Sequence, residues 1–137
     1  MSRYLSKSKY TSFRQCPKIL WMRTYKPDEE VIGPALQARF ESGNEVGDLA
    51  MGLFGEFEEV TSYDAAGKLD LSEMLSRTKD CLSRGVENIC EASFSWDGNY
   101  CAVDILHRQG DGYAVYEVKS STNSASEPAE PEELRHY

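Results

Sequence analysis

The hydrophobic period of the chain changes abruptly near Val86, and this change constrains the fold more than any other feature. Before Val86, apolar residues recur about every 3.6 positions; after it they alternate with a period of two, as in a β-strand. Two turn signals, Asp97-Gly98 and Gly110-Asp111-Gly112, divide the second part and are typical of tight hairpins. The sequence therefore predicts an antiparallel meander of three strands, over residues 88–95, 99–108 and 113–120.

Two helices are predicted upstream of the meander with clear boundaries. The segment 34–54 has the clearest helical spacing, and Pro34 suits its first turn. The segment 72–85 has Ser72 as a candidate N-cap and Gly85 as a C-terminal stop.

A further helix is predicted over residues 10–25. Ser12 is a candidate N-cap for it, although Pro17 would better suit the first turn of a helix that begins near Cys16. Residues 57–60 could add a short strand. The expected fold class is α/β, with a mixed sheet of three or four strands that contains the antiparallel meander and is flanked by helices.

Hairpin pairing brings three carboxylates together across the meander. If each turn signal closes a two-residue loop, Glu91 lies opposite Asp104, and Asp104 lies opposite Glu117. A second loop shifted by one residue puts Lys119 opposite Asp104 instead and keeps the same face. Opposed side chains point the same way, so the acids are expected to form a line across the three strands.

Such a row of carboxylates needs a counter-charge if it is buried. Like charges opposite each other destabilise a sheet, and burial penalises unpaired carboxylates. Lys119 is one possible counter-charge, and a divalent cation such as Mg²⁺ is another. The alternative is that the face points to solvent, where acids and lysines are common. Ala102, Leu106 and Val115 on the same face favour partial burial.

Charge is distributed unevenly along the chain. The net charge is −8 at pH 7, yet residues 1–26 contain seven Lys and Arg residues and no Asp or Glu. A basic segment of this kind can bind phosphates, and it is also typical of a solvated amphipathic helix with a basic face. The candidate phosphate contacts are Lys7, Lys9, Arg14 and Lys18.

The residues around Asp104 and Glu117 resemble the signature of the PD-(D/E)XK nuclease superfamily. The segments Val103-Asp104-Ile105-Leu106 and Tyr116-Glu117-Val118-Lys119-Ser120 are similar to its Asp and Glu-x-Lys motifs on adjacent strands. The similarity is greatest to RecB-like nuclease domains, including a bacterial family of domains of unknown function. Residues 5–10 and 16–21 resemble the N-terminal segment of that family, residues 40–50 resemble its second helix, and the resemblance extends over residues 5–122.

The resemblance implies a restriction-endonuclease-like core and a metal-dependent nuclease that acts on DNA rather than RNA. It implies that Asp104 and Glu117 bind Mg²⁺ or Mn²⁺, with the carbonyl of Val118 as a further ligand. It also implies that Lys119 orients the attacking water or helps to deprotonate it. Glu91, which comes from the strand pairing, is either a water-mediated ligand or a charge on the sheet face.

The chain departs from the RecB-like pattern at one helical position. Those domains often carry a metal-binding His where this chain has Gly47, and Glu45 could substitute for it. The expected Gln and Tyr helix after Lys119 has no convincing match.

His107 alternates to the face opposite Asp104 and is expected to be structural.

The four cysteines are scattered and form no Cys-x-x-Cys pair. Cys16 occupies the place of an early iron–sulfur ligand in some relatives, but the late trio of ligands is missing, so an iron–sulfur cluster is not expected. The cysteines instead predict free thiols and a reducing, cytoplasmic location. Those in the predicted core are Cys81, Cys90 and Cys101.

One nuclease-like domain is expected over residues 1–122, and a polar, acidic tail or truncated edge over residues 123–137. No apolar run is long enough to cross a bilayer, so no membrane partner is expected. Nucleic acid is the expected partner, with a homo-oligomer or the remainder of a larger protein as further possibilities. The alternatives are an inactive nuclease-fold module for nucleic-acid binding or assembly, and an acidic interaction domain with an accidental motif.

Overall fold

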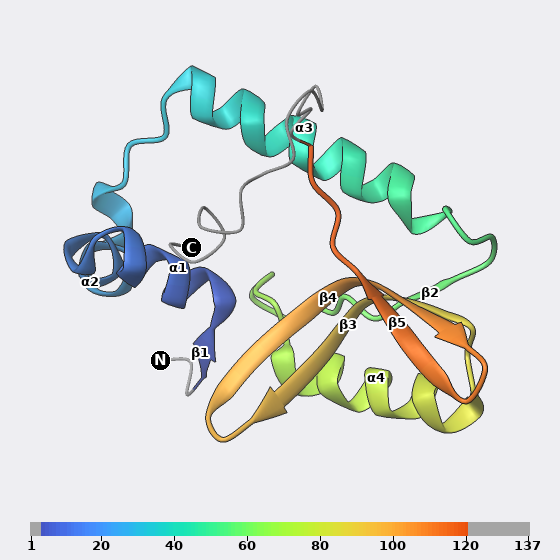
Figure 1. Cartoon of the computed structure of the whole chain (residues 1–137). Helices are drawn as coiled ribbons and strands as arrows, with labels where there is room; N and C mark the ends of the chain where they lie inside the picture. Colours follow the sequence, from blue (N-terminus) through green and yellow to red (C-terminus); the bar gives the residue numbers. More distant parts are fainter. Residues whose placement is uncertain (1–3, 121–137) are drawn as a thin grey trace, which may run out of the picture.

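The computed structural model describes residues 4–120, which form a curled mixed sheet flanked by helices (Figure 1). The sheet has five strands in the order β1-β4-β3-β2, with β5 also paired to β4. The α/β class and the mixed sheet predicted from the sequence are therefore confirmed. The tail expected over residues 123–137 lies outside the described part of the chain.

The antiparallel meander is made by β3 (Asn88–Trp96), β4 (Asn99–Gln109) and β5 (Gly112–Tyr116). β3 and β4 match their predicted segments closely. The third strand was predicted to reach residue 120, but β5 ends at Tyr116. Residues 117–119, which contain the Glu-x-Lys motif, therefore follow the strand instead of belonging to it.

Both hairpin registers agree with the predicted two-residue loops. Trp96 pairs with Asn99 across the first turn, and Gln109 pairs with Gly112 across the second. Asp97 and Gly98 have φ values of 46° and 76°, as a type I′ turn requires at both central positions. The turn residues therefore determine which residues of the three strands lie opposite one another.

Two short parallel strands complete the sheet. β1 (Leu5–Ser6) runs beside the beginning of β4, and β2 (Glu58–Glu59) runs beside the beginning of β3. β2 lies within the short strand predicted over residues 57–60, which is confirmed. β1 brings the total to five strands instead of three or four, and a two-residue strand is too short to show a period in the sequence.

The prediction of one helix over residues 10–25 is wrong. The segment folds as two helices, α1 (Lys7–Gln15) and α2 (Pro17–Tyr25), with Cys16 extended between them. Pro17 is the first residue of α2, where a missing backbone N–H removes no helical hydrogen bond. The chain therefore turns at Cys16, as the position of the proline allows.

The cap of α1 is Ser6, six residues before Ser12. The Oγ of Ser6 accepts a hydrogen bond from the backbone amide of Lys9 at 3.3 Å. Ser12 is instead buried within α1, and its hydroxyl accepts a hydrogen bond from the Arg23 guanidinium at 2.9 Å. This bond ties α1 to α2.

The remaining helices follow the predicted order. The 3₁₀ helix η1 (Pro27–Glu29) leads to α3 (Pro34–Met51), which confirms the long helix but ends before residue 54. α4 (Leu71–Arg84) confirms the last helix, and Gly85 ends it with a left-handed φ of 70°. Its N-cap is Asp70 and not Ser72, because the Asp70 Oδ1 accepts from the amide of Glu73 at 3.0 Å.

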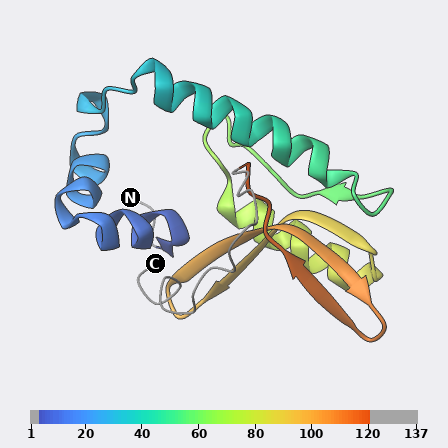
Figure 2. The same cartoon turned by 45° about the horizontal axis from the view of Figure 1, so that its top comes forward.

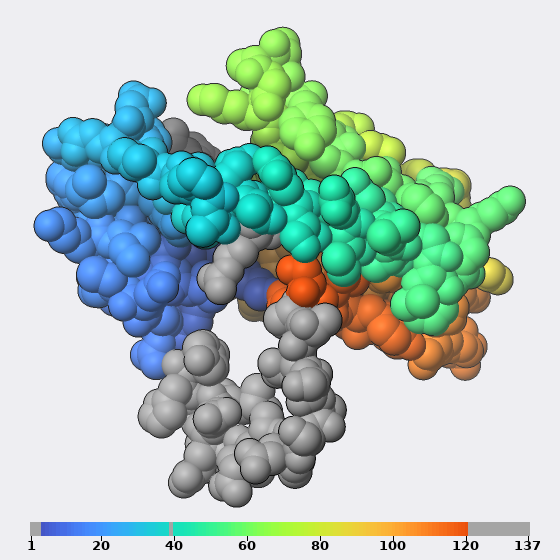
Figure 3. Space-filling model, turned by 90° about the horizontal axis from the view of Figure 1, so that it is seen from above, coloured from blue at the N-terminus to red at the C-terminus, as the bar shows by residue number. Residues whose placement is uncertain are grey.

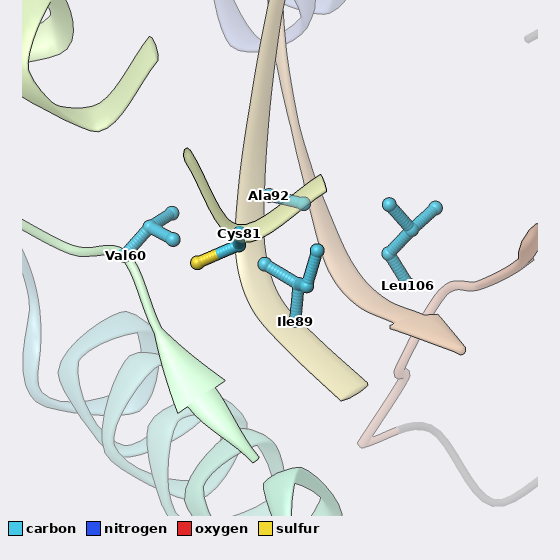
Figure 4. Close-up of a cluster of buried hydrophobic side chains, with 5 residues drawn as sticks. All are labelled: Val60, Cys81, Ile89, Ala92 and Leu106. Carbon is cyan, nitrogen blue, oxygen red and sulfur yellow. The ribbon is translucent and has the colours of Figure 1, made fainter. Parts of the chain in front are cut away.

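The hydrophobic core lies between α4 and the sheet. Ile89 of β3 and Val60 beyond β2 are fully buried there, and Cys81 of α4 contributes from the helix side. Figure 4 shows the central side chains, which are Val60, Cys81, Ile89, Ala92 and Leu106. All four cysteines of the chain are free thiols, as expected, and Cys81 and Cys90 are buried. The prediction that Cys101 lies in the core is wrong, because its side chain is exposed.

α3 lies on the other side of the sheet from α4 and spans the distance from the N-terminal helices to the sheet (Figures 1 and 2). Figure 3, viewed from above, shows it crossing this face of the molecule. None of its residues with a described side chain is fully buried, and Leu49 is 81% exposed. Within residues 4–120, no helix has the length and apolar character to cross a membrane.

Replacement of Gly85 by Ala is expected to lower the free energy of unfolding by about 1 kcal/mol. The left-handed φ of 70° is costly for a residue with a Cβ, and that atom would lie 2.8 Å from the Nη1 of Arg108. Urea unfolding followed by circular dichroism measures the change. Gly52→Ala is the control, because Gly52 at the end of α3 has a φ of −82° and nothing within 4 Å of a new Cβ. Equal destabilisation by both substitutions would contradict this account of α4.

Candidate functional site

A gap in one edge of β4 brings distant parts of the chain together. β3 occupies one edge of β4, and the other edge is shared by β1 and β5. β1 ends with Ser6 opposite Tyr100, and β5 ends with Tyr116 opposite Ile105. Because the two strands run toward each other along this edge, the residues that follow them enter the same gap.

Asp104 lies in this gap and binds the chain that leaves β5. Its Oδ2 accepts a hydrogen bond from the backbone amide of Val118 at 2.5 Å. Val118 stands between Glu117 and Lys119, so this bond holds the Glu-x-Lys segment against the carboxylate of Asp104. The two halves of the motif therefore meet, although β5 has ended before Glu117.

Glu91 lies across from Asp104 on the other neighbouring strand. The flanking pairs are Cys90 with Ile105 and Ala92 with Val103, which leaves Glu91 facing Asp104 in register. Glu91 has a φ of 57°, a left-handed conformation that is uncommon for a residue with a side chain. The regular strand pairing is interrupted at this position.

The predicted line of three carboxylates across the sheet is therefore only partly present. Its first pair, Glu91 with Asp104, is interrupted by the left-handed backbone. Its second pair, Asp104 with Glu117, does not form because β5 stops one residue earlier and Asp104 bonds to the Val118 amide instead. Tertiary contacts bring the acids together where sheet pairing does not.

Glu117 is surrounded by positive charge. The ammonium groups of Lys119 and Lys7 both donate to its Oε1. These hydrogen bonds, with Lys119 contributing more than Lys7, hold the pKa of the Glu117 carboxyl below its ordinary value. Glu117 is therefore ionised and already provided with counter-charges.

A cavity of about 220 Å³ lies between α3 and the centre of the sheet. From the sheet side it is lined by Glu91, Asp104 and Val118, and Glu117 is not among its lining residues. From α3 it is lined by Gly43, Asn44, Gly47, Asp48 and Met51. The cavity therefore contains the carboxylates that the two lysines do not reach.

Asn44 and Asp48 are potential ligands that the sequence analysis missed. They are four residues apart on α3, so they share the helix face that carries Gly43 and Gly47. That spacing is the signal by which they could have been found. Glu45, suggested as a substitute for the absent His, is exposed and does not line the cavity.

Among residues 4–120, none of the groups that shift the pKa of Glu91 is positively charged. Burial is the main cause that raises the pKa of its carboxyl, and repulsion from Asp104, Glu59 and Glu117 raises it further. A divalent cation would relieve this repulsion, and carboxylate, amide and carbonyl oxygens are the ligands that Mg²⁺ and Mn²⁺ prefer. The donor set around the cavity therefore fits such a cation in chemistry and in charge.

The site is not already arranged in a coordination geometry. Among residues 4–120, no group of three or more His, Cys, Asp or Glu side chains is close enough to hold a metal ion. The carboxylate of Glu117 is engaged by lysines, and that of Asp104 by a backbone amide. Binding of a cation would require these side chains to rearrange.

The other predicted phosphate contacts lie away from the gap. The ammonium of Lys9 donates to the carbonyl oxygen of Tyr4 at 3.2 Å. Arg14 of α1 and Lys18 of α2 are exposed, whereas Lys7 joins the site itself. Only one of the four basic residues, Lys7, therefore has a contact with the carboxylates of the gap among the described residues.

His107 has a structural role, as its strand position suggests. Its Nδ1 lies 2.7 Å from the Oδ1 of Asn88, and its ring stacks on Phe54 with centroids 4.1 Å apart. These contacts fix the imidazole between β3 and the loop after α3. It is not a lining residue of the cavity.

Comparisons with protein-family models, with curated proteins and with solved structures find no match. The geometry and charge of the gap are therefore what indicate its chemistry.

Replacement of Glu91 by Gln is expected to stabilise the protein near pH 7 and to have little effect below about pH 4. The folded state raises the pKa of Glu91 above 4.5, so the proton is bound more tightly in the folded state than in the unfolded chain. The contribution of Glu91 is fully present below 4.5 and is lost as the pH rises through the folded pKa, whereas Gln stays neutral throughout. Urea unfolding from pH 3.5 to 7.5 measures the difference.

The control for this prediction is Glu87→Gln, which removes the same charge from an exposed residue just before β3. A pH-dependent gain that is equal in both variants would show that Glu91 has no special environment.

Proposed function

We propose that this protein is a metal-dependent nuclease with a restriction-endonuclease-like core, which hydrolyses phosphodiester bonds in DNA. The observation that carries the proposal is the hydrogen bond between the Asp104 carboxylate and the Val118 amide. This bond joins Asp104 of β4 to the Glu-x-Lys segment that follows β5. The cavity beside it is lined by the carboxylates of Glu91, Asp104 and Asp48. The resemblance of these residues to the PD-(D/E)XK signature supports the same reading.

In the proposed site, Asp104 and Glu117 hold Mg²⁺ or Mn²⁺, and the carbonyl oxygen of Val118 is a further ligand. Glu91 and Asp48 line the cavity and would bind the cation directly or through water. When bound, the cation supplies an activated water and positive charge for the phosphate. Lys119 lies beside Glu117 and is positioned to orient that water and to stabilise charge on the phosphate.

The N-terminal helices supply the electrostatic complement to a nucleic acid. Residues 4–26 carry six Lys and Arg residues and no acid, in a chain whose net charge is −8. Arg14 and Lys18 are exposed on α1 and α2, where they would contact the phosphate backbone without reading its sequence. DNA binding is therefore expected to weaken steeply as the salt concentration rises.

A second candidate function is that of an inactive nuclease-fold module used for nucleic-acid binding or protein assembly. The lack of a ready coordination group among residues 4–120 favours it. Exposed apolar side chains, such as Trp21 of α2 and Leu49 of α3, would suit contacts with another protein or a second copy of the chain. Metal-independent DNA binding without cleavage would select this candidate.

Asp104→Asn and Lys119→Ala are each expected to lower the rate of DNA cleavage by at least about 100-fold. The first removes an anionic ligand and the second removes the cation beside Glu117. Cleavage of single- and double-stranded DNA in Mg²⁺ and in Mn²⁺ measures the effect. Asp111→Asn is the matched control, because Asp111 lies in the exposed turn between β4 and β5 and is expected to keep full activity.

Cleavage that survives both substitutions, or that appears with neither metal, would remove the catalytic assignment. Metal binding is checked separately by thermal unfolding, since a cation that binds only the folded state raises the melting temperature. Asp104→Asn should reduce this rise, and Asp111→Asn should preserve it.

A further inference from the structure

Lys7 and Glu117 form an ion pair that joins residues 110 positions apart in the sequence. Lys7 is the first residue of α1, and Glu117 is the first residue after β5. The sequence analysis assigned Lys7 to the phosphate-binding surface of an N-terminal helix. In the structure its ammonium instead shares the Oε1 of Glu117 with Lys119.

The position of Lys7 follows from the geometry of the β4 edge. β1 pairs in parallel with β4 and ends at Ser6, so Lys7 would lie beside Cys101 if the strand continued. β5 pairs antiparallel with β4 and ends at Tyr116, so Glu117 would lie beside Asp104. A distance of three residues along a strand is about 10 Å, which the extended side chains of Lys and Glu can bridge.

Helix formation fixes the backbone that carries Lys7. The Oγ of Ser6 caps α1, so the chain leaves β1 and begins to coil at Lys7. The Lys7 side chain therefore starts from a defined position at the mouth of the gap. Its side chain is 58% exposed and that of Glu117 is 38% exposed, so water and ions have access to the pair.

An exposed ion pair of this kind is weak and can exchange partners. Its net contribution to stability is small, because water competes for both charges. A divalent cation that binds the Oε1 of Glu117 must displace the ammonium groups that share this oxygen. Lys119 belongs to the proposed catalytic motif, whereas Lys7 comes from a separate element.

We propose that Lys7 competes with the metal ion for the carboxylate of Glu117 at the gap in β4. The inference rests on the proposed function, because it assigns Lys7 a role toward the same cation. When no cation is bound, Lys7 thereby supplies part of the positive charge beside Glu117.

Removal of Lys7 changes the metal affinity in opposite directions, depending on whether Lys7 competes with the metal or only supports the fold. Removal of an ammonium that occupies a metal ligand makes the metal bind more tightly. Removal of a contact that merely supports the fold makes the site less ordered and the metal bind more weakly. The direction of the change in metal affinity therefore distinguishes the two roles.

The experiment is a titration of the full chain with Mn²⁺ by isothermal calorimetry, without DNA. Lys7→Met is expected to bind Mn²⁺ at least about fivefold more tightly than the unsubstituted protein, the change expected on removing one charge about 4 Å away in water. Lys7→Arg retains the charge and should restore the original affinity. Lys79→Met, on the exposed face of α4, removes a lysine far from the gap and should leave the affinity unchanged.

Equal or weaker Mn²⁺ binding by Lys7→Met would overturn this inference and leave the proposed function standing. Absence of Mn²⁺ binding by the unsubstituted protein would instead remove the proposed function, and this inference with it. Thermal unfolding of each variant in EDTA shows whether it is folded. If Lys7→Met does not fold, Lys7→Gln provides the same loss of charge with a polar side chain and is judged by the same two outcomes.

Discussion

The shared edge of β4 is the constraint on which the rest of the site depends. A strand edge offers one row of backbone donors and acceptors, so β1 and β5 cannot both continue across it. Each strand ends, and the chain beyond it is free to take another direction. Lys7 and the Glu117 segment meet in the remaining gap, where the side chain of Asp104 provides the acceptor that a strand partner would otherwise provide for the Val118 amide. Because neither β1 nor β5 can continue along β4, the side chains that follow them meet in the gap.

Charge divides this meeting point into two parts. Glu117 lies on the side supplied with ammonium groups, and its pKa is lowered, mainly by Lys119 and then by Lys7. Glu91 lies on the cavity side, and its pKa is raised, mainly by burial and then by the neighbouring acids. The two pKa values move in opposite directions because the lysine ammonium groups bind Glu117, whereas Glu91 is buried beside other acids. The cavity side is therefore where an added cation would gain most, and it is also where α3 contributes Asn44 and Asp48.

Local signals in the sequence predicted those parts of the fold that are decided locally. The turns at Asp97-Gly98 and Gly110-Asp111 set both hairpin registers, since a two-residue loop leaves one pairing for the strands it joins. Gly85 ended α4 as expected, because the left-handed conformation required there suits a residue without a Cβ. The same local reasoning failed over residues 10–25, where Pro17 begins a second helix. It also failed at the caps of α1 and α4, where an earlier polar residue caps the helix. Several residues could cap each helix, and the packing of the helix decides among them.

The sequence by itself determined that Glu91 would lie opposite Asp104, because the pairing of two strands in a hairpin depends on the turn between them. It did not determine which charges would surround them. The end of β5 at Tyr116, the arrival of Lys7 from β1, and the approach of Asn44 and Asp48 on α3 all depend on contacts between segments far apart in the chain. Such contacts leave no periodic or local mark on the sequence, since they arise from the competition of whole elements for the same edge and the same face of a sheet. The turns in the sequence therefore decide which residues of β3 and β4 lie opposite each other. The tertiary structure decides which charges surround the acids.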